Sequence, residues 1–151
     1  MELKSLKDIQ NLSKKISKIV EPGDNIFLYG KLGVGKTTFV RFLINHLEVE
    51  NKIQKSDVLS PTFNIVYDYD IGQIKIYHYD LYRLKNHKDI LELGIFEMPK
   101  NNIKIVEWPE LIKSKPKDRI DFLFKYTKNF SSRSVKIYGF GKWRNYKFNE
   151  I

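Results

Sequence analysis

The stretch Gly30-Lys-Leu-Gly-Val-Gly-Lys-Thr37 matches the phosphate-loop pattern G-x-x-x-x-G-K-[ST] in full. It follows the apolar run 25–29 directly, and a helical pattern begins where it ends. Glycines in such a loop let backbone N–H groups converge on phosphate oxygens, because a side chain would push the anion away or forbid a turn with positive φ. The lysine reaches the β- and γ-phosphates, and the final hydroxyl can bind Mg²⁺. The stretch therefore predicts a strand, a loop and a helix around a nucleoside triphosphate site.

The apolar periodicity of the rest of the chain predicts further helices and strands on both sides of this loop. Helices are expected at 5–20, 36–47 and 86–92, and strands at 25–29, 65–69, 74–79, 103–107, 119–126 and 134–140. The strand pairs joined by 70–73 and by 129–132 have the pattern of antiparallel hairpins. We therefore predict an α/β fold of three layers, similar to the P-loop NTPases, with a mixed sheet and a single domain over residues 1–151.

Composition excludes several classes of protein. The chain has no cysteine, which rules out thiol catalysis, cysteine zinc sites and disulfides. No apolar run approaches the roughly 20 residues of a membrane-spanning helix, and the start of the chain lacks the basic and then apolar plan of a signal peptide. We expect a cytoplasmic protein with no membrane partner.

The positive charge is concentrated near the C-terminus. Residues 113–147 hold eleven Lys and Arg against two acids, whereas the remainder holds sixteen of each sign. One interpretation is a surface for tRNA or an acidic partner, in which aromatic side chains stack on bases. The other is a solvated face on strands whose aromatic side chains fill the core, and the sequence leaves both open. The aromatic residues concerned are Tyr126, Phe130, Tyr138, Phe140, Trp143 and Tyr146.

Two acidic residues end predicted strands, where a nucleotide site needs a group to hold Mg²⁺ or its water shell. Asp80 directly follows the strand 74–79, and Glu107 is the last residue of the strand 103–107. Each could instead be a solvated residue at a strand end. Thr62, in a segment that could respond to the γ-phosphate, could equally be a turn former.

Two further residues near these acids have open roles. His78 could relay a proton, although a lone strand histidine is more often structural. Arg83 could stabilise charge or pair with Asp80 or Glu107.

In their order along the chain these segments resemble the TsaE (YjeE) family, the small bacterial ATPases of tRNA threonylcarbamoyladenosine biosynthesis. The resemblance covers residues 23 to about 112, and beyond Lys113 it extends only to a hairpin-like pattern. The matching motifs are Gly23-Asp24, Gly30-Lys-Leu-Gly-Val-Gly-Lys-Thr-Thr38-Phe-Val-Arg41, Ser60-Pro-Thr-Phe63, His78-Tyr-Asp80-Leu-Tyr-Arg83-Leu, Glu92-Leu-Gly94 and Val106-Glu107-Trp108-Pro109-Glu110.

The resemblance implies an ATP- and Mg²⁺-dependent accessory protein that enables repeated turnover of threonylcarbamoyl transferase subunits of the TsaD and TsaB kind. The protein would contact tRNA indirectly or through the basic C-terminal segment. ATP would contact Gly33, Val34, Gly35, Lys36, Thr37, Thr38 and Trp108. Mg²⁺ would lie near Thr37, Asp80 and Glu107, and hydrolysis would depend on Asp80, Glu107 and Thr62.

Two other functions are compatible with the same residues. A small-molecule kinase could use the same loop, although kinases usually add lid and acceptor-binding insertions, and the core uses most of this chain. A non-hydrolysing RNA-binding module could rest on the basic segment instead.

Overall fold

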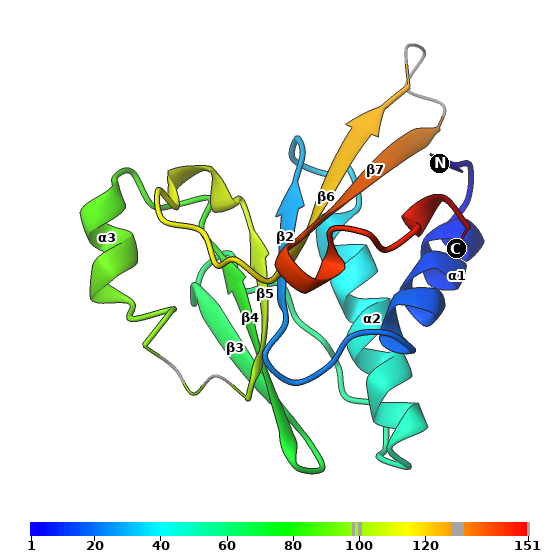
Figure 1. Ribbon diagram of the computed structural model, residues 1–151, viewed down its shortest axis with the longest axis horizontal. Coiled ribbons are helices and arrows are strands. Elements are labelled where there is room, and N and C mark those ends of the chain that lie inside the picture. Colours follow the sequence, from blue (N-terminus) through cyan, green and yellow to red (C-terminus); the bar gives the residue numbers. More distant parts are fainter. Residues whose placement is uncertain (98, 100, 128–131, 151) are drawn as a thin grey trace.

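A seven-stranded sheet forms the centre of the computed structural model, which describes residues 1–97, 99, 101–127 and 132–150 (Figure 1). The strands are β1 (Glu2–Leu3), β2 (Asn25–Tyr29), β3 (Val66–Ile71), β4 (Ile74–Asp80), β5 (Ile103–Glu107), β6 (Arg119–Tyr126) and β7 (Arg133–Phe140). The helices are α1 (Leu6–Ser17), α2 (Lys36–Glu50) and α3 (His87–Glu92), with 3₁₀ turns η1 (Pro109–Leu111), η2 (Gly141–Trp143) and η3 (Phe148–Glu150). The order in the sheet is β1-β7-β6-β2-β5-β4-β3.

The strand that precedes the phosphate loop lies in the middle of the sheet. β2 pairs in parallel with both β5 and β6, and β4 pairs in parallel with β5. The outer strands β3, β7 and β1 pair antiparallel with their neighbours. The carboxyl ends of four parallel strands therefore meet at one edge, which is where ligands bind in open α/β sheets.

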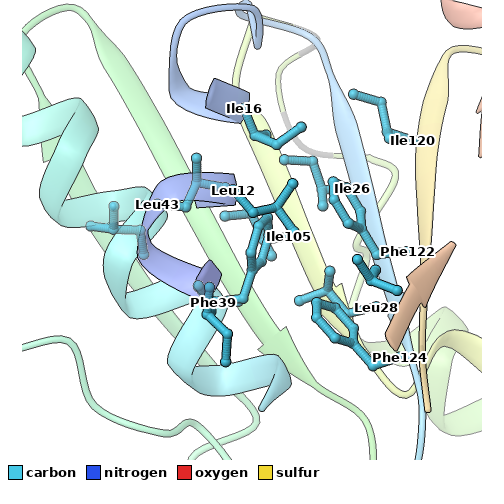
Figure 2. Packing of buried hydrophobic residues seen from close by; sticks show 14 of the residues in the cluster. Leu12, Ile16, Ile26, Leu28, Phe39, Leu43, Ile105, Ile120, Phe122 and Phe124 are labelled. Atoms are coloured by element: carbon cyan, nitrogen blue, oxygen red, sulfur yellow. The ribbon is translucent and has the colours of Figure 1, made fainter. Parts of the chain in front are cut away.

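Helices and turns cover the two faces of the sheet. α1 and α2 pack together on one face, and α3 lies on the other side (Figure 1). Between the sheet and the two long helices, Phe39 packs against Phe122 and Phe124 with ring centroids 4.9 and 5.8 Å apart (Figure 2). On the opposite face, Phe27 and Val106 lie in a second apolar cluster with Ile90 of α3. The three layers and the mixed sheet of a P-loop NTPase-like fold confirm the predicted fold class.

Several local predictions agree with the observed elements. The strands at 25–29, 103–107 and 119–126 have the predicted bounds. Ser5 and Asp8 form a capping box at the start of α1, and Asn86 and Asp89 form another at the start of α3. Both caps satisfy backbone N–H groups that the first helical turn leaves unpaired.

Other local predictions were wrong in extent. α1 ends at Ser17 rather than at residue 20, and α2 continues to Glu50 rather than ending at residue 47. The first hairpin turns at Gly72 and Gln73 alone, because Ile71 pairs with Ile74 and joins the core. The short strand β1 was missed, since two residues carry no periodicity and their pairing with β7 is long-range. Residues 128–131, which include Phe130 and most of the second predicted turn, lie outside the described part of the chain.

Gly30 occupies a position that no other residue can fill without strain. Its φ is +140°, and a Cβ atom there would lie 2.5 Å from the backbone oxygen of Phe124. We expect Gly30→Ala to lower the free energy of unfolding by about 2 to 3 kcal/mol, because positive φ and a backbone clash add together. Urea denaturation measures this change.

Gly72→Ala is the matched control for this prediction. Its φ is +63°, but the nearest atom to an added Cβ, the Asn51 side-chain oxygen, is 4.0 Å away. Only the conformational cost of about 1 kcal/mol applies there. Equal losses of unfolding free energy in the two variants would show that the clash between the added Cβ and the Phe124 oxygen is unimportant.

None of the helices in the described part of the chain is both long enough and apolar enough to cross a lipid bilayer.

Candidate active site at the carboxyl edge of the sheet

The phosphate loop connects the end of β2 to the start of α2, as the sequence predicted. Gly33 and Gly35 both have positive φ, and Gly35 is the N-cap of α2. A Gly35 N-cap offers no side chain to satisfy the first N–H groups of the helix. These N–H groups and the positive end of the helix dipole are the features that bind phosphate at a helix N-terminus.

Lys36 lies folded back over this loop and is only 4% exposed. Its ammonium donates hydrogen bonds to the carbonyl oxygens of Gly30, at 2.7 Å, and Lys31, at 3.2 Å. The same ammonium lies 3.9 Å from the centre of the Trp108 ring. Burial lowers the pKa of Lys36, and the nearby carboxylates of Glu107 and Asp80 oppose that shift. Trp108 thus lies beside the phosphate loop.

Asp80 and Glu107 lie side by side at the carboxyl ends of β4 and β5, where they are register partners. Both are almost fully buried. The Thr37 hydroxyl donates to a Glu107 oxygen at 3.0 Å, and the Thr62 hydroxyl donates to an Asp80 oxygen at 2.7 Å. Four residues predicted from separate segments are therefore brought together at the mouth of the phosphate loop.

His78 has a closer link to this cluster than its sequence position indicated. The side chain is fully buried, and its Nε2 lies 2.9 Å from the second carboxylate oxygen of Glu107. The Nδ1 atom has no hydrogen-bond partner in the described structure. Because a carboxylate only accepts, Nε2 carries the proton that it donates to Glu107. His78 and Thr37 together hold both oxygens of Glu107 in place.

Arg83 does not pair with either acid among the described residues. Its guanidinium lies 5.2 Å from the centre of the Phe63 ring, and both side chains are exposed. Tyr82 packs on Trp108 with ring centroids 4.8 Å apart. Of the two roles left open for Arg83, pairing with an acid is not observed among the described residues, and its charge-stabilising role stays a prediction.

The donor set is compatible with Mg²⁺. The described residues hold no cluster of three or more His, Cys, Asp or Glu side chains that could bind a metal by themselves. Mg²⁺ at nucleotide sites needs only one or two carboxylates, a hydroxyl and phosphate oxygens, and keeps several waters. Thr37 can supply the hydroxyl, and Glu107 and Asp80 can supply the carboxylates. The phosphate oxygens would come from a bound nucleotide.

The aromatic side chains of the C-terminal segment have divided roles. Trp143 is buried in the core and donates from its ring nitrogen to Asp24 at 2.9 Å. Tyr138, Phe140 and Tyr146 remain more than one third exposed. The Arg119 guanidinium lies 3.7 Å from the centre of the Phe140 ring. Trp143 therefore fits the interpretation as a core residue, whereas a surface for tRNA or an acidic partner stays a prediction for the exposed residues.

The fold and the loop at its carboxyl edge define a protein of the P-loop NTPase-like class. The family model described as "Threonylcarbamoyl adenosine biosynthesis protein TsaE" matches residues 3–135. The chain therefore belongs to the TsaE family.

Curated relatives named tRNA threonylcarbamoyladenosine biosynthesis protein TsaE agree with this assignment. The protein from Rickettsia felis is 40% identical over 111 residues, which is 74% of this chain and 63% of that protein. The Aquifex aeolicus protein is 36% identical over 136 residues, covering 90% of this chain and 92% of that protein. The match thus spans less than two thirds of the Rickettsia felis protein but nearly all of the Aquifex aeolicus one.

A solved structure supports the fold over almost the whole chain. The crystal structure of YdiB from Bacillus subtilis superposes with a TM-score of 0.72 at 25% identity, covering 94% of this chain and 85% of that one.

Proposed function

We propose that this chain binds and hydrolyses ATP with Mg²⁺ as an accessory protein in the formation of N6-threonylcarbamoyladenosine in tRNA. The relatives named for this biosynthesis support the pathway. The observation that carries the ATPase part is the hydrogen bond of 3.0 Å between Thr37 and Glu107. It joins the phosphate loop to an acid on the neighbouring strand, which is the pairing that a metal-dependent phosphoryl transfer needs.

Each residue of the site has a stated role in this proposal. The N–H groups of residues 33–38 and the Lys36 ammonium bind the phosphates, for which Lys36 must exchange its two carbonyl partners for phosphate oxygens. Thr37 and Glu107 hold Mg²⁺, which neutralises charge that develops on the phosphate oxygens. Asp80 orders water near the γ-phosphate, and Thr62, bonded to Asp80, responds to that phosphate.

The proposed site is expected to be open to solvent and to depend on partners. Phe63, Tyr82 and Arg83 are exposed around it. An open site admits bulk water and holds its reactive groups less firmly, so turnover of the isolated chain is expected to be slow. Subunits of the TsaD and TsaB kind are the proposed partners, in the cytoplasm.

A reconstituted reaction tests the proposal. Transferase subunits, ATP, threonylcarbamoyl donor and tRNA are combined with and without this chain, and modified adenosine is counted per transferase. We expect several turnovers with the chain and no more than about one without it. Lys36→Met, which keeps the side-chain volume but not the charge, is the matched control and is expected to behave like omission of the chain.

Other outcomes would favour the rival functions. Stoichiometric phosphorylation of a small acceptor would show a kinase. Full support of turnover by Lys36→Met would show that nucleotide binding is unnecessary and would favour an RNA-binding module.

A further inference from the structure

A groove of about 620 Å³ lies on the sheet at the end opposite the phosphate loop. Its lining includes Asn25, the first residue of β2, whereas the phosphate loop follows the last residue of the same strand. At about 3.3 Å per residue, the two sites are roughly 15 Å apart. In Figure 1 the phosphate loop is at the top of β2 and the segment before β2 is at the bottom. The groove is therefore separate from the candidate active site.

Lys104 lines this groove with a buried side chain that has almost no partner. It lies on β5 and is only 5% exposed. Its ammonium makes a single long hydrogen bond, of 3.5 Å, to the Pro99 carbonyl, and it forms no ion pair with the described residues. Burial lowers the pKa of Lys104, and no carboxylate among the described residues opposes the shift. A buried cation without a counter-charge is costly, so it marks a place where an anion would be stabilising.

Three more lysines line the groove, and all belong to the basic segment 113–147. Lys117 has no side-chain partner among the described residues. Lys115 donates to the Tyr29 hydroxyl at 2.8 Å, which leaves its remaining protons available. The Lys142 ammonium already forms ion pairs with Glu21 and Asp24. Asp118, an acid of the lining, accepts a hydrogen bond from the backbone of residue 142.

We propose that this groove binds the phosphate backbone of RNA, with Lys104, Lys115 and Lys117 as its cations. The Phe96 ring supports nucleic acid over a small anion, because it is 41% exposed on the lining and can stack on a base. Several cations together with an exposed aromatic side chain are typical of single-stranded RNA sites. The choice of tRNA as the probe rests on the proposed function, but RNA binding in the groove involves no residue of the ATP site.

The experiment measures binding of unmodified tRNA across a salt series with saturating Mg-ATP, so that the phosphate loop is occupied. We expect Lys104→Met and Lys117→Gln each to reduce the slope of log affinity against log salt by about 1, and the double variant by about 2. Phe96→Ala should weaken binding about tenfold without changing the slope, because stacking releases no counterions. ATP hydrolysis should stay unchanged in all of them.

The double variant Lys7→Gln and Lys15→Gln is the matched control. It removes the same charge from exposed positions at α1, on the other face of the sheet, and should leave the slope unchanged. Lys117 is exposed, so its variant keeps the test valid even if Lys104→Met alters the fold.

Equal slopes for wild type, Lys117→Gln and the control would overturn the proposal. A poly-glutamate peptide that binds more tightly than tRNA and loses affinity in Lys104→Met would also overturn it, in favour of an acidic protein partner. If the wild-type chain binds tRNA but does not hydrolyse ATP, the result would count against the proposed function and not against the RNA groove.

Discussion

Lys36→Ala is expected to weaken ATP binding about a hundredfold or more. The ammonium lies at the opening of the phosphate loop and donates to two carbonyl oxygens that phosphate oxygens can replace. Each hydrogen bond to a charged group contributes roughly 1.5 to 3 kcal/mol, so the loss of two accounts for this factor. Titration with a fluorescent ATP analogue or by calorimetry measures the affinity.

The fold should survive this change. Lys36 is 4% exposed, and removal of a buried cation relieves a desolvation cost while it opens space beside Trp108. Lys36→Met keeps that packing and should weaken ATP binding to a similar degree. Lys31→Ala, an exposed lysine of the same loop, is the control and should bind ATP within about threefold of wild type. Affinity at the wild-type level in folded Lys36→Met would refute the nucleotide site.

Glu107→Gln should slow ATP hydrolysis about a hundredfold to a thousandfold and change ATP affinity by less than about tenfold. The carboxylate is bonded to Thr37 and His78, so its charge is fixed beside the phosphate loop. Hydrolysis requires that charge to hold the metal in transition-state geometry, whereas binding rests mainly on the loop and Lys36. Phosphate release and nucleotide affinity, measured in parallel, separate the two effects.

The amide in this variant also has a predictable structural cost. Thr37 and His78 each donate to a different oxygen of Glu107, whereas the amide that replaces the carboxylate would offer a single acceptor oxygen. One donor is left unsatisfied, which costs about 1 to 3 kcal/mol of stability. Glu110→Gln removes a charge from an exposed residue three positions away and should leave hydrolysis within about twofold. Slower hydrolysis in both variants alike would assign the effect to overall charge near Lys36.

Local chemistry made the phosphate loop and most elements predictable from sequence. The loop needs glycines at fixed spacing between a strand and a helix, and the observed bounds of β2 and the start of α2 agree. Caps such as Ser5 with Asp8 satisfy N–H groups within a few residues, so they are readable from neighbours in the chain. The two acids could be predicted because parallel strands end at a common edge.

Partners distant in sequence could not be read in this way. The pairing of β1 with β7 joins residues about 130 positions apart. The sequence left open whether Trp143 is exposed, and in the structure it is buried in the core with its ring nitrogen donating to Asp24, just before β2. Lys104 was not singled out from the sequence, because its burial on β5 and the absence of a counter-charge around it among the described residues both depend on distant segments.

The sequence by itself thus determined the class of fold, the phosphate loop and the identity of the candidate acids, because these follow from periodicity and short-range geometry. The tertiary structure decided that Glu107 is held between Thr37 and His78, that Thr62 contacts Asp80, and that Arg83 lies apart from both acids. These outcomes depend on strand register and on the packing of α2 against the sheet. Contacts between segments tens of residues apart are set by the whole core, and no single segment encodes them.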